Sequence, residues 1–326
     1  MQEAHFLKLN YENWKQIESV LESSEKINPD YLAELFIRLT DDLSYANTYY
    51  PGSKTAQFLN ELTTKIHQMI YKNKKENKSR ILQFWKYELP ETLASCRKEL
   101  FYAFIIFLIA LLVGIVSTAN DDSFVRVMLG DRYVNMTLEN IQNNDPMAVY
   151  KKMNQTDMFL GITLNNVWAS MMTFLAGILL SFGSGYMLFY NGVMLGAFQY
   201  FFYQKGFLIQ ALLTVWIHGV LEISAIILAG CAGIIMGNSI LFPGTFPRRH
   251  SFVAGARKGL KIIIGMVPIF ILAAFLEAFI TRHTEMPVFL SLSIIFLSLI
   301  FIIWYFIIYP YQLTHKEKFD GDITKI

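Results

Sequence analysis

Long apolar runs are the feature that most limits the fold of this chain. From residue 101 onward, six stretches approach the roughly 20 apolar residues that a helix needs to cross a hydrocarbon core of about 30 Å. In lipid every backbone polar group must be paired within the protein, and a helix pairs these groups within a single segment. Only 17% of the residues are charged, against about 25% in soluble domains. We therefore predict an all-α fold, a polytopic membrane helix bundle of about six spans.

The predicted spans differ in length and in how they end. The Gly183-Ser184-Gly185 segment is expected to form the tight turn between the second and third spans. The fourth would measure about 45 Å as one straight helix, so we expect it to tilt, break or project. Pro268 lies inside the fifth span, and Pro310 is expected to end the sixth. The spans are predicted at residues 101–119, 161–182, 185–203, 207–237, 262–280 and 288–309.

Basic residues close to the spans predict the orientation, because cytoplasmic loops carry an excess of lysine and arginine. Arg97 and Lys98 precede the first span, whereas the short loops of the opposite side contain only Lys205 and Arg282 as basic residues. We therefore expect both termini in the cytoplasm. The loop between the fourth and fifth spans has no acidic residue and carries Arg248, Arg249, Arg257, Lys258 and Lys261.

The composition also divides the chain into parts. Apolar residues recur at helical spacing in Tyr31, Leu35 and Leu39 and again in Phe58 and Leu62, which predicts helices ahead of the first span. The predicted parts are a cytoplasmic helical domain at 1–80, an interfacial elbow helix at 81–98, a transmembrane bundle at 99–312 with an extracytoplasmic loop at 120–158, and a cytoplasmic tail at 313–326.

The elbow helix has two interpretations. Phe84, Trp85 and Tyr87 lie beside Lys86, and Pro90 follows. Aromatic and basic side chains together suit a helix in the headgroup layer. Alternatively, this segment is the last core helix of the cytoplasmic domain.

Ionisable residues at bilayer depth cost at least about 2.5 to 3.5 kcal/mol on insertion scales, so each needs a partner or a purpose. His218 and Glu222 lie four residues apart in the fourth span and so share a helical face, on which they can hydrogen-bond. Asn165, Asn166 and Asn191 bring amide groups into neighbouring spans, and Glu277 lies toward the outer end of the fifth. His218 and Glu222 form either a proton relay or cation site in a transporter, or a buried pair that holds the helices together with the help of asparagine amides from the second and third spans.

The sequence favours no catalytic chemistry. A zinc site needs three or four ligands, and no second histidine lies within a span, so we predict neither a metal nor another cofactor. The one serine–histidine pair to consider, Ser184 with His218, is separated in depth. Basic and acidic totals of 28 and 26 nearly cancel without a basic stripe, which argues against nucleic acid as a partner. We predict a protein that is not an enzyme.

Small residues four apart let helix backbones approach closely. This spacing predicts a compact bundle of the second, third and fourth spans, and the same faces can pair between two chains as a homodimer. The glycines concerned are Gly192, Gly196, Gly230, Gly233 and Gly237.

Several of these motifs occur together in one known family. The run from His218 to Ile226 contains His-Gly-x-x-Glu and is followed by Ala229-Gly230 and Ala232-Gly233, while Asn191-Gly192 begins a matching segment upstream. This part of the chain resembles the stage II sporulation protein M family. Residues 124–150 and 38–46 resemble its long Bacteroidota-type branch.

The resemblance implies a multi-pass protein of the bacterial cytoplasmic (inner) membrane. In spore formers the family member works with peptidoglycan-degrading partners, as a membrane component of an envelope complex and not as the hydrolase. This chain departs from the short sporulation proteins by its N-terminal domain and its outer loop, so a sporulation role does not carry over.

Two functions follow as hypotheses. The first is a non-enzymatic scaffold, whose partners are the lipid bilayer and other membrane or envelope proteins. The alternative is a permease or channel with His218 and Glu222 at an intramembrane polar site.

Overall fold

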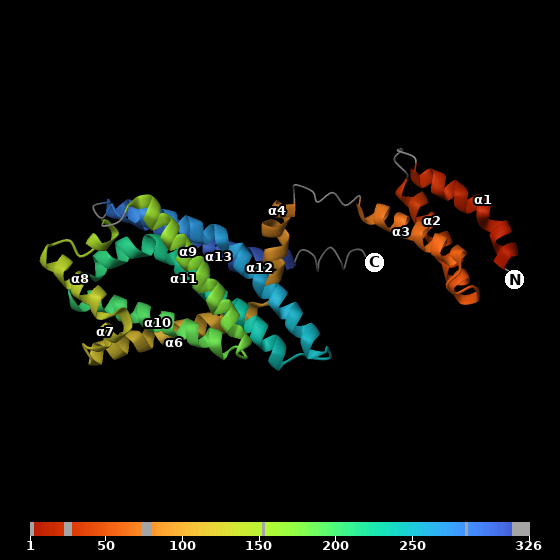
Figure 1. The fold of residues 1–326 in the computed structure, drawn as a ribbon. Helices are drawn as coiled ribbons and strands as arrows, with labels where there is room; N and C mark the ends of the chain where they lie inside the picture. Colours follow the sequence, from red (N-terminus) through yellow and green to blue (C-terminus); the bar gives the residue numbers. More distant parts are fainter. Residues whose placement is uncertain (1–2, 23–27, 73–79, 152–153, 284–285, 315–326) are drawn as a thin grey trace. The chain divides into compact units, whose positions relative to one another are not determined.

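The computed structural model describes residues 3–22, 28–72, 80–151, 154–283 and 286–314. Contacts between Cα atoms divide the chain into two compact units, Met1–Leu82 and Gln83–Ile326. Every regular element in the described ranges is a helix, which confirms the all-α prediction (Figure 1). The predicted cytoplasmic tail at 313–326 lies outside the described residues from residue 315 onward.

The described residues of the first unit include three complete helices, α1 (Glu3–Glu22), α2 (Pro29–Tyr49) and α3 (Lys54–Lys72). Asn28 caps α2 by accepting a hydrogen bond from the Asp30 backbone N–H at 3.0 Å. The indole Nε1 of Trp14 donates to Asp42 Oδ2 at 2.7 Å and so joins α1 to α2. The helices enclose a core made of Phe6, Trp14, Leu32, Leu35, Leu39, Ala46, Ala56, Leu59, Leu62 and Ile66.

The second unit is built on long apolar helices. In the part of the chain that the structure describes, five segments are long and apolar enough to cross a membrane, by length and composition: Arg97–Asn120, Gln155–Ile178, Leu208–Leu241, Arg248–Thr281 and Val288–Thr314. They contain α6 (Arg97–Asn120), α9 (Gln155–Leu175), η3 (Ala176–Ile178), α11 (Leu208–Leu241), α12 (Arg248–Phe275), η4 (Leu276–Thr281), α13 (Val288–Ile303) and η5 (Trp304–Ile308). The predicted third span is α10 (Phe182–Gln204), which is not among the five.

Several helix ends differ from the sequence-based expectation. The turn between α9 and α10 lies at residues 179–181, where Leu180 and Ser181 have positive φ angles of 54° and 69°, and Gly183 to Gly185 lie inside α10. The helix α11 is continuous over 34 residues and is not broken. Arg248 begins α12, so the basic residues of that predicted loop lie in its first turns. The last helical segment continues past Pro310 to Thr314, after the π-helix η5.

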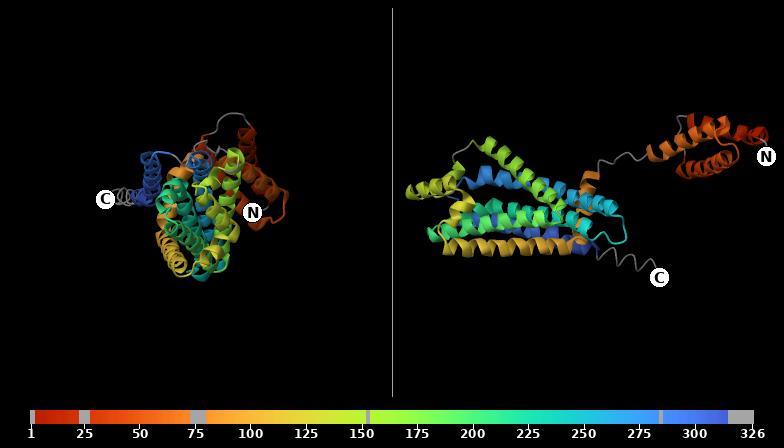
Figure 2. Two further views of the ribbon diagram at one scale, coloured as in Figure 1. Left: turned by 90° about the vertical axis from the view of Figure 1, so that its left-hand side faces the viewer. Right: turned by 60° about the horizontal axis from the view of Figure 1, so that its bottom comes forward.

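Glycines bring these helices into backbone contact. A Cβ added at Gly196 of α10 would collide with the carbonyl oxygen of Leu111 in α6, and one added at Gly233 of α11 would collide with Ser184 of α10. Figure 2 shows α6 and α10 side by side along their length. The other predicted glycines make similar approaches: Gly192 to α6, Gly230 to Leu188, and Gly237 to Ser181. Thus α11 packs against α9 and α10 as predicted, while the α10 glycine pair faces the first span.

From Gln83 onward the elbow segment belongs to this second unit. It comprises α4 (Arg80–Gln83), the π-helix η1 (Phe84–Glu88) and α5 (Leu89–Ser95). Leu89 is fully buried and lies against Gly265 of α12. The hydroxyl of Tyr305 donates to the carbonyl oxygen of Trp85 at 2.6 Å, and Lys261 pairs with Glu88 at 2.7 Å. The elbow therefore shares its apolar core with the long helices.

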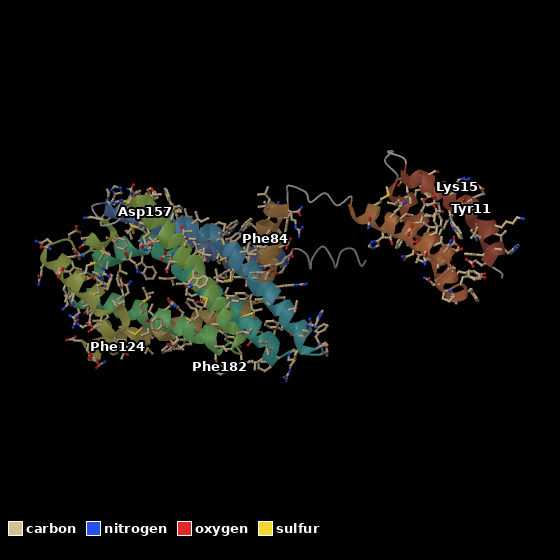
Figure 3. The ribbon with its side chains drawn as sticks, in the orientation of Figure 1. Tyr11, Lys15, Phe84, Phe124, Asp157 and Phe182 are labelled. Atoms are coloured by element: carbon tan, nitrogen blue, oxygen red, sulfur yellow. The ribbon has the colours of Figure 1, made fainter. Side chains whose placement is uncertain are left out.

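The loop between α6 and α9 folds into a helical cap. It contains α7 (Phe124–Leu129), α8 (Asp131–Gln142) and η2 (Ala148–Lys151), at the end of the bundle where α9 begins near Asp157 (Figure 3). Its Val125, Val134 and Met147 share a core with Phe202 and Ala211 from the α10–α11 end. The cap thus covers the end of the bundle at which α11 starts.

Candidate functional site

The buried polar residues of α11 meet an acidic residue from another apolar helix. His218 and Glu222 lie about one turn apart in α11, and Glu277 comes from η4. One ligand-type atom from each of the three side chains lies within 4.8 Å of the others. His218 is only 3% exposed, and its Nε2 lies 3.9 Å from Glu277 Oε2. We call these three residues the His–Glu–Glu cluster.

His218 is held in place by two neighbours. Its Nδ1 is 3.0 Å from the hydroxyl oxygen of Thr281, which also belongs to η4. The ring of Tyr150, from η2 of the cap, packs edge-to-face against the imidazole with centroids 5.9 Å apart. Burial raises the pKa of the Tyr150 phenol well above its usual range, so this hydroxyl stays neutral. A π-helix such as η4 is often found at a functional site.

Glu222 joins three helices through its carboxyl group. The amide Nδ2 of Asn166 in α9 donates to Glu222 Oε1 at 2.5 Å. One carboxylate oxygen each of Glu222 and Glu277 lie within 4.8 Å of each other. A proton on one of the two groups would let them share a hydrogen bond, because an ionised carboxylate only accepts. The cluster therefore links α9, α11 and η4 through shared polar contacts.

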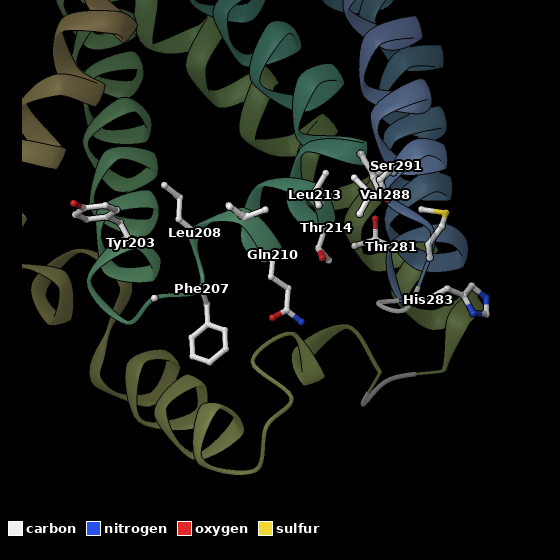
Figure 4. A pocket seen from close by; sticks show the side chains of 14 residues that line it. Tyr203, Phe207, Leu208, Gln210, Leu213, Thr214, Thr281, His283, Val288 and Ser291 are labelled. Carbon is white, nitrogen blue, oxygen red and sulfur yellow. The ribbon is translucent and has the colours of Figure 1, made fainter.

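A pocket of about 710 Å³ lies next to the cluster. Thr214 and Ile217 of α11 line it together with Thr281 of η4, and Gln210 and His283 also contribute to its wall (Figure 4). Because Thr281 hydrogen-bonds His218, a wall residue of the pocket directly contacts the cluster. The pocket extends along the first turns of α11, toward the end that the cap covers.

Most of the second unit matches a known protein family. The family model described as stage II sporulation protein M matches residues 103–282, from within α6 to the residue after η4. The chain belongs to the stage II sporulation protein M family. A second model, described as a domain of unknown function, matches residues 4–72 and thus the three helices of the first unit. No curated protein and no solved structure matches the chain.

The region matched by the stage II sporulation protein M (SpoIIM) model contains all the polar residues that the sequence predicted for the intramembrane site. The structure brings only some of them together. Asn166 contacts Glu222, whereas its neighbour Asn165 is exposed. Asn191 donates to the carbonyl oxygen of Met187 in its own helix at 2.8 Å. No hydrogen bond joins His218 to Glu222 among the described residues, although both belong to one cluster.

Glu277 belongs to the His–Glu–Glu cluster, but the site predicted from the sequence did not include it. Sequence reasoning placed it at the outer end of its span and His218 near the middle of another, so the two were not paired. The spacing of Glu277 and Thr281, two polar residues four apart in an apolar helix, is the signal that could have found them.

The geometry also excludes joint catalysis by Ser184 and His218. Ser184 donates its hydroxyl to the carbonyl oxygen of Thr173 at 2.6 Å and packs against Gly233. From residue 218 to residue 233, α11 advances about 22 Å. Ser184 and His218 are therefore too far apart to act together. The His–Glu–Glu cluster can hold a proton between its carboxyl groups or bind a cation.

Proposed function

We propose that this SpoIIM-family protein is a non-enzymatic scaffold of the cell envelope, embedded in the inner membrane. The observation that carries the proposal is that two parts outside the long apolar helices are folded around buried apolar side chains. One is the α1–α3 unit, which has its own core around Trp14 and Leu39, and the other is the cap, whose Val134 and Met147 share a core with the ends of α10 and α11. A scaffold needs folded surfaces of this kind on which partners can dock.

The packing of the bundle supports the same proposal. Between His218 and the opposite end of α11, glycines hold the helices at backbone contact, as at Gly233 against Gly177 of η3 and Gly237 against Ser181. Bundles packed in this way are suited to hold a fixed shape. The second model match, over residues 4–72, treats α1–α3 as a domain in its own right.

Photo-cross-linking in cells tests the scaffold. A cross-linking amino acid is introduced into the full chain at Leu9 of α1, which is 58% exposed, with Phe296 of α13, 57% exposed, as the matched control on an apolar span. We expect discrete protein adducts from position 9. Adducts from position 296 should be mainly lipid. Absence of a protein adduct at position 9 and at further exposed positions such as Ile37 would contradict the proposal.

A permease is the second candidate, and one observation favours it. The pocket wall contains Thr281, whose hydroxyl contacts the buried imidazole of His218. A pocket that reaches an ionisable cluster is half of an alternating-access path, and intramembrane ionisable residues often mark such paths.

Complementation of a deletion strain separates the two candidates. Under the scaffold proposal, Leu9→Glu abolishes function while Thr214→Phe, which fills the pocket, leaves it intact. Under the permease hypothesis the results are reversed, because transport depends on the pocket and not on α1. Detergent melting curves must show both variants folded.

A further inference from the structure

The His–Glu–Glu cluster has the dimensions of a small metal site. Bonds of about 2.0–2.2 Å in tetrahedral geometry place ligand atoms about 3.3 Å apart. In the structure, His218 Nε2 and Glu277 Oε2 are 3.9 Å apart, and the whole set lies within 4.8 Å. If the two glutamate side chains rotated so that their carboxylate oxygens moved by about 1 Å, three ligands would form a coordination shell.

Other side chains already orient two of these ligands. The hydrogen bond between Nδ1 of His218 and Thr281 leaves Nε2 as the nitrogen that faces the carboxyl groups. Nε2 lies 3.9 Å from Glu277 Oε2, which is beyond hydrogen-bond distance. Histidines that bind metals usually donate their other ring N–H to a neighbouring acceptor, which fixes the ring. Asn166 orients Glu222 in the same way from α9.

The charge of the cluster points to a divalent cation. Two partly buried carboxylates this close together need positive charge to balance them, since an unbalanced charge away from water is strongly unfavourable. A proton on either glutamate would supply part of that balance. A divalent cation beside a neutral imidazole would balance both carboxylates completely.

The donor atoms indicate which cation fits. One imidazole nitrogen and carboxylate oxygens suit Zn²⁺ and similar first-row ions, while Mg²⁺ and Ca²⁺ prefer all-oxygen shells and Cu⁺ prefers sulfur. Three protein ligands leave a fourth position for water. The adjoining pocket, with Thr281 and Thr214 in its wall, provides an entry path and space for that water.

We propose that His218 Nε2 and one carboxylate oxygen each of Glu222 and Glu277 bind a divalent first-row transition-metal cation, with Zn²⁺ as the best match. This site goes beyond the scaffold function and is independent of it. It also departs from the prediction that the sequence carries no metal site, which considered one histidine and one glutamate. Glu277 supplies the third ligand from η4.

Zinc binding to the purified full-length protein in detergent tests the proposal. Added Zn²⁺ is titrated against a chromophoric chelator, and bound metal is counted by mass spectrometry. We expect about one Zn²⁺ per chain, with affinity at least about 100-fold lower in Glu277→Gln. Asn166→Ala, which removes only an orienting partner, should weaken binding about 10- to 100-fold. Asn165→Ala is the matched control and should bind as the unchanged protein does, because Asn165 is exposed.

A second measurement does not depend on how the variants fold. X-ray absorption of the zinc-loaded, unchanged protein should show nitrogen and oxygen ligands, including one imidazole, and no sulfur. Zinc bound through Cys96 or Cys231 would show sulfur and would overturn the proposal. The proposal is also overturned if the unchanged protein binds no zinc, or if folded Glu277→Gln binds it equally well.

Discussion

Thr281 and His218 are 63 residues apart in the sequence, and the hydroxyl oxygen of the first lies 3.0 Å from Nδ1 of the second. Thr281 also lines the pocket of about 710 Å³, so one side chain contacts both the pocket and a buried imidazole. The contact fixes the ring of His218 relative to Glu277, which sits four residues before Thr281 in the same π-helix. The alignment of η4 with α11 thus depends on this pair.

Replacing Thr281 by valine should lower the free energy of unfolding by about 0.5 to 2 kcal/mol, because the buried Nδ1 loses its partner at nearly constant side-chain volume. Thr281→Ser keeps the hydroxyl and should behave more like the unchanged protein. Thr214→Val is the matched control: Thr214 lines the same pocket and makes no side-chain hydrogen bond among the described residues. Denaturation in detergent micelles measures all three, and equal effects at both threonines would contradict the assigned role of Thr281.

The glycines of α10 provide a second, internally controlled prediction. Gly196→Ala places a methyl group against the carbonyl oxygen of Leu111, so α6 and α10 must separate, and we expect a loss of about 1 to 3 kcal/mol. Gly185→Ala, in the same helix, has no atom within 4 Å of its new methyl group. Alanine favours helices by up to about 1 kcal/mol over glycine, so this variant should be equally stable or more stable. Unfolding in detergent that ranked the two variants in the opposite order would show that α6 and α10 do not pack here.

Hydropathy predicted the helices well because a backbone in lipid must pair its own polar groups. It predicted helix ends poorly where charge and apolar character change within one helix. Arg248 and Lys261 marked a loop in the sequence, yet both belong to α12, whose first turns are basic. Pro310 was expected to stop the last helix, but a π-helix precedes it and the helix continues to Thr314.

The candidate site shows why contacts between helices are harder to predict than the helices themselves. Spacing along α11 correctly put His218 and Glu222 on one face, but their hydrogen bonds go to Thr281 and Asn166 on other helices. At 34 residues, α11 is about 51 Å long and exceeds the bilayer core. The sequence gives no depth register for so long a helix, so Glu277 could not be matched to it.

Labelling of single cysteines tests the orientation predicted from the basic residues. In a chain lacking native thiols, a cysteine at Asn143 of the cap should react with an impermeant maleimide in intact cells, and one at His250 should react only after lysis. Both side chains are exposed, so accessibility does not separate them. Reaction at position 250 in intact cells would reverse the orientation.

The elbow supplies the last prediction. Leu89 is fully buried against Gly265 of α12, and a segment belonging only to the α1–α3 unit would not make this contact. Leu89→Ala leaves a cavity in the core shared with the long helices and should cost about 2 to 5 kcal/mol. Leu82→Ala, at a side chain 73% exposed, is the control and should change stability little. The measurement is detergent unfolding followed by tryptophan fluorescence in a chain that keeps only Trp85 of its five tryptophans, since Trp85 donates to the Gly265 carbonyl at 3.4 Å and reports on the same contact. If Leu89→Ala matched Leu82→Ala in stability and left this fluorescence unchanged, the elbow would have to be detached from α12 in the membrane.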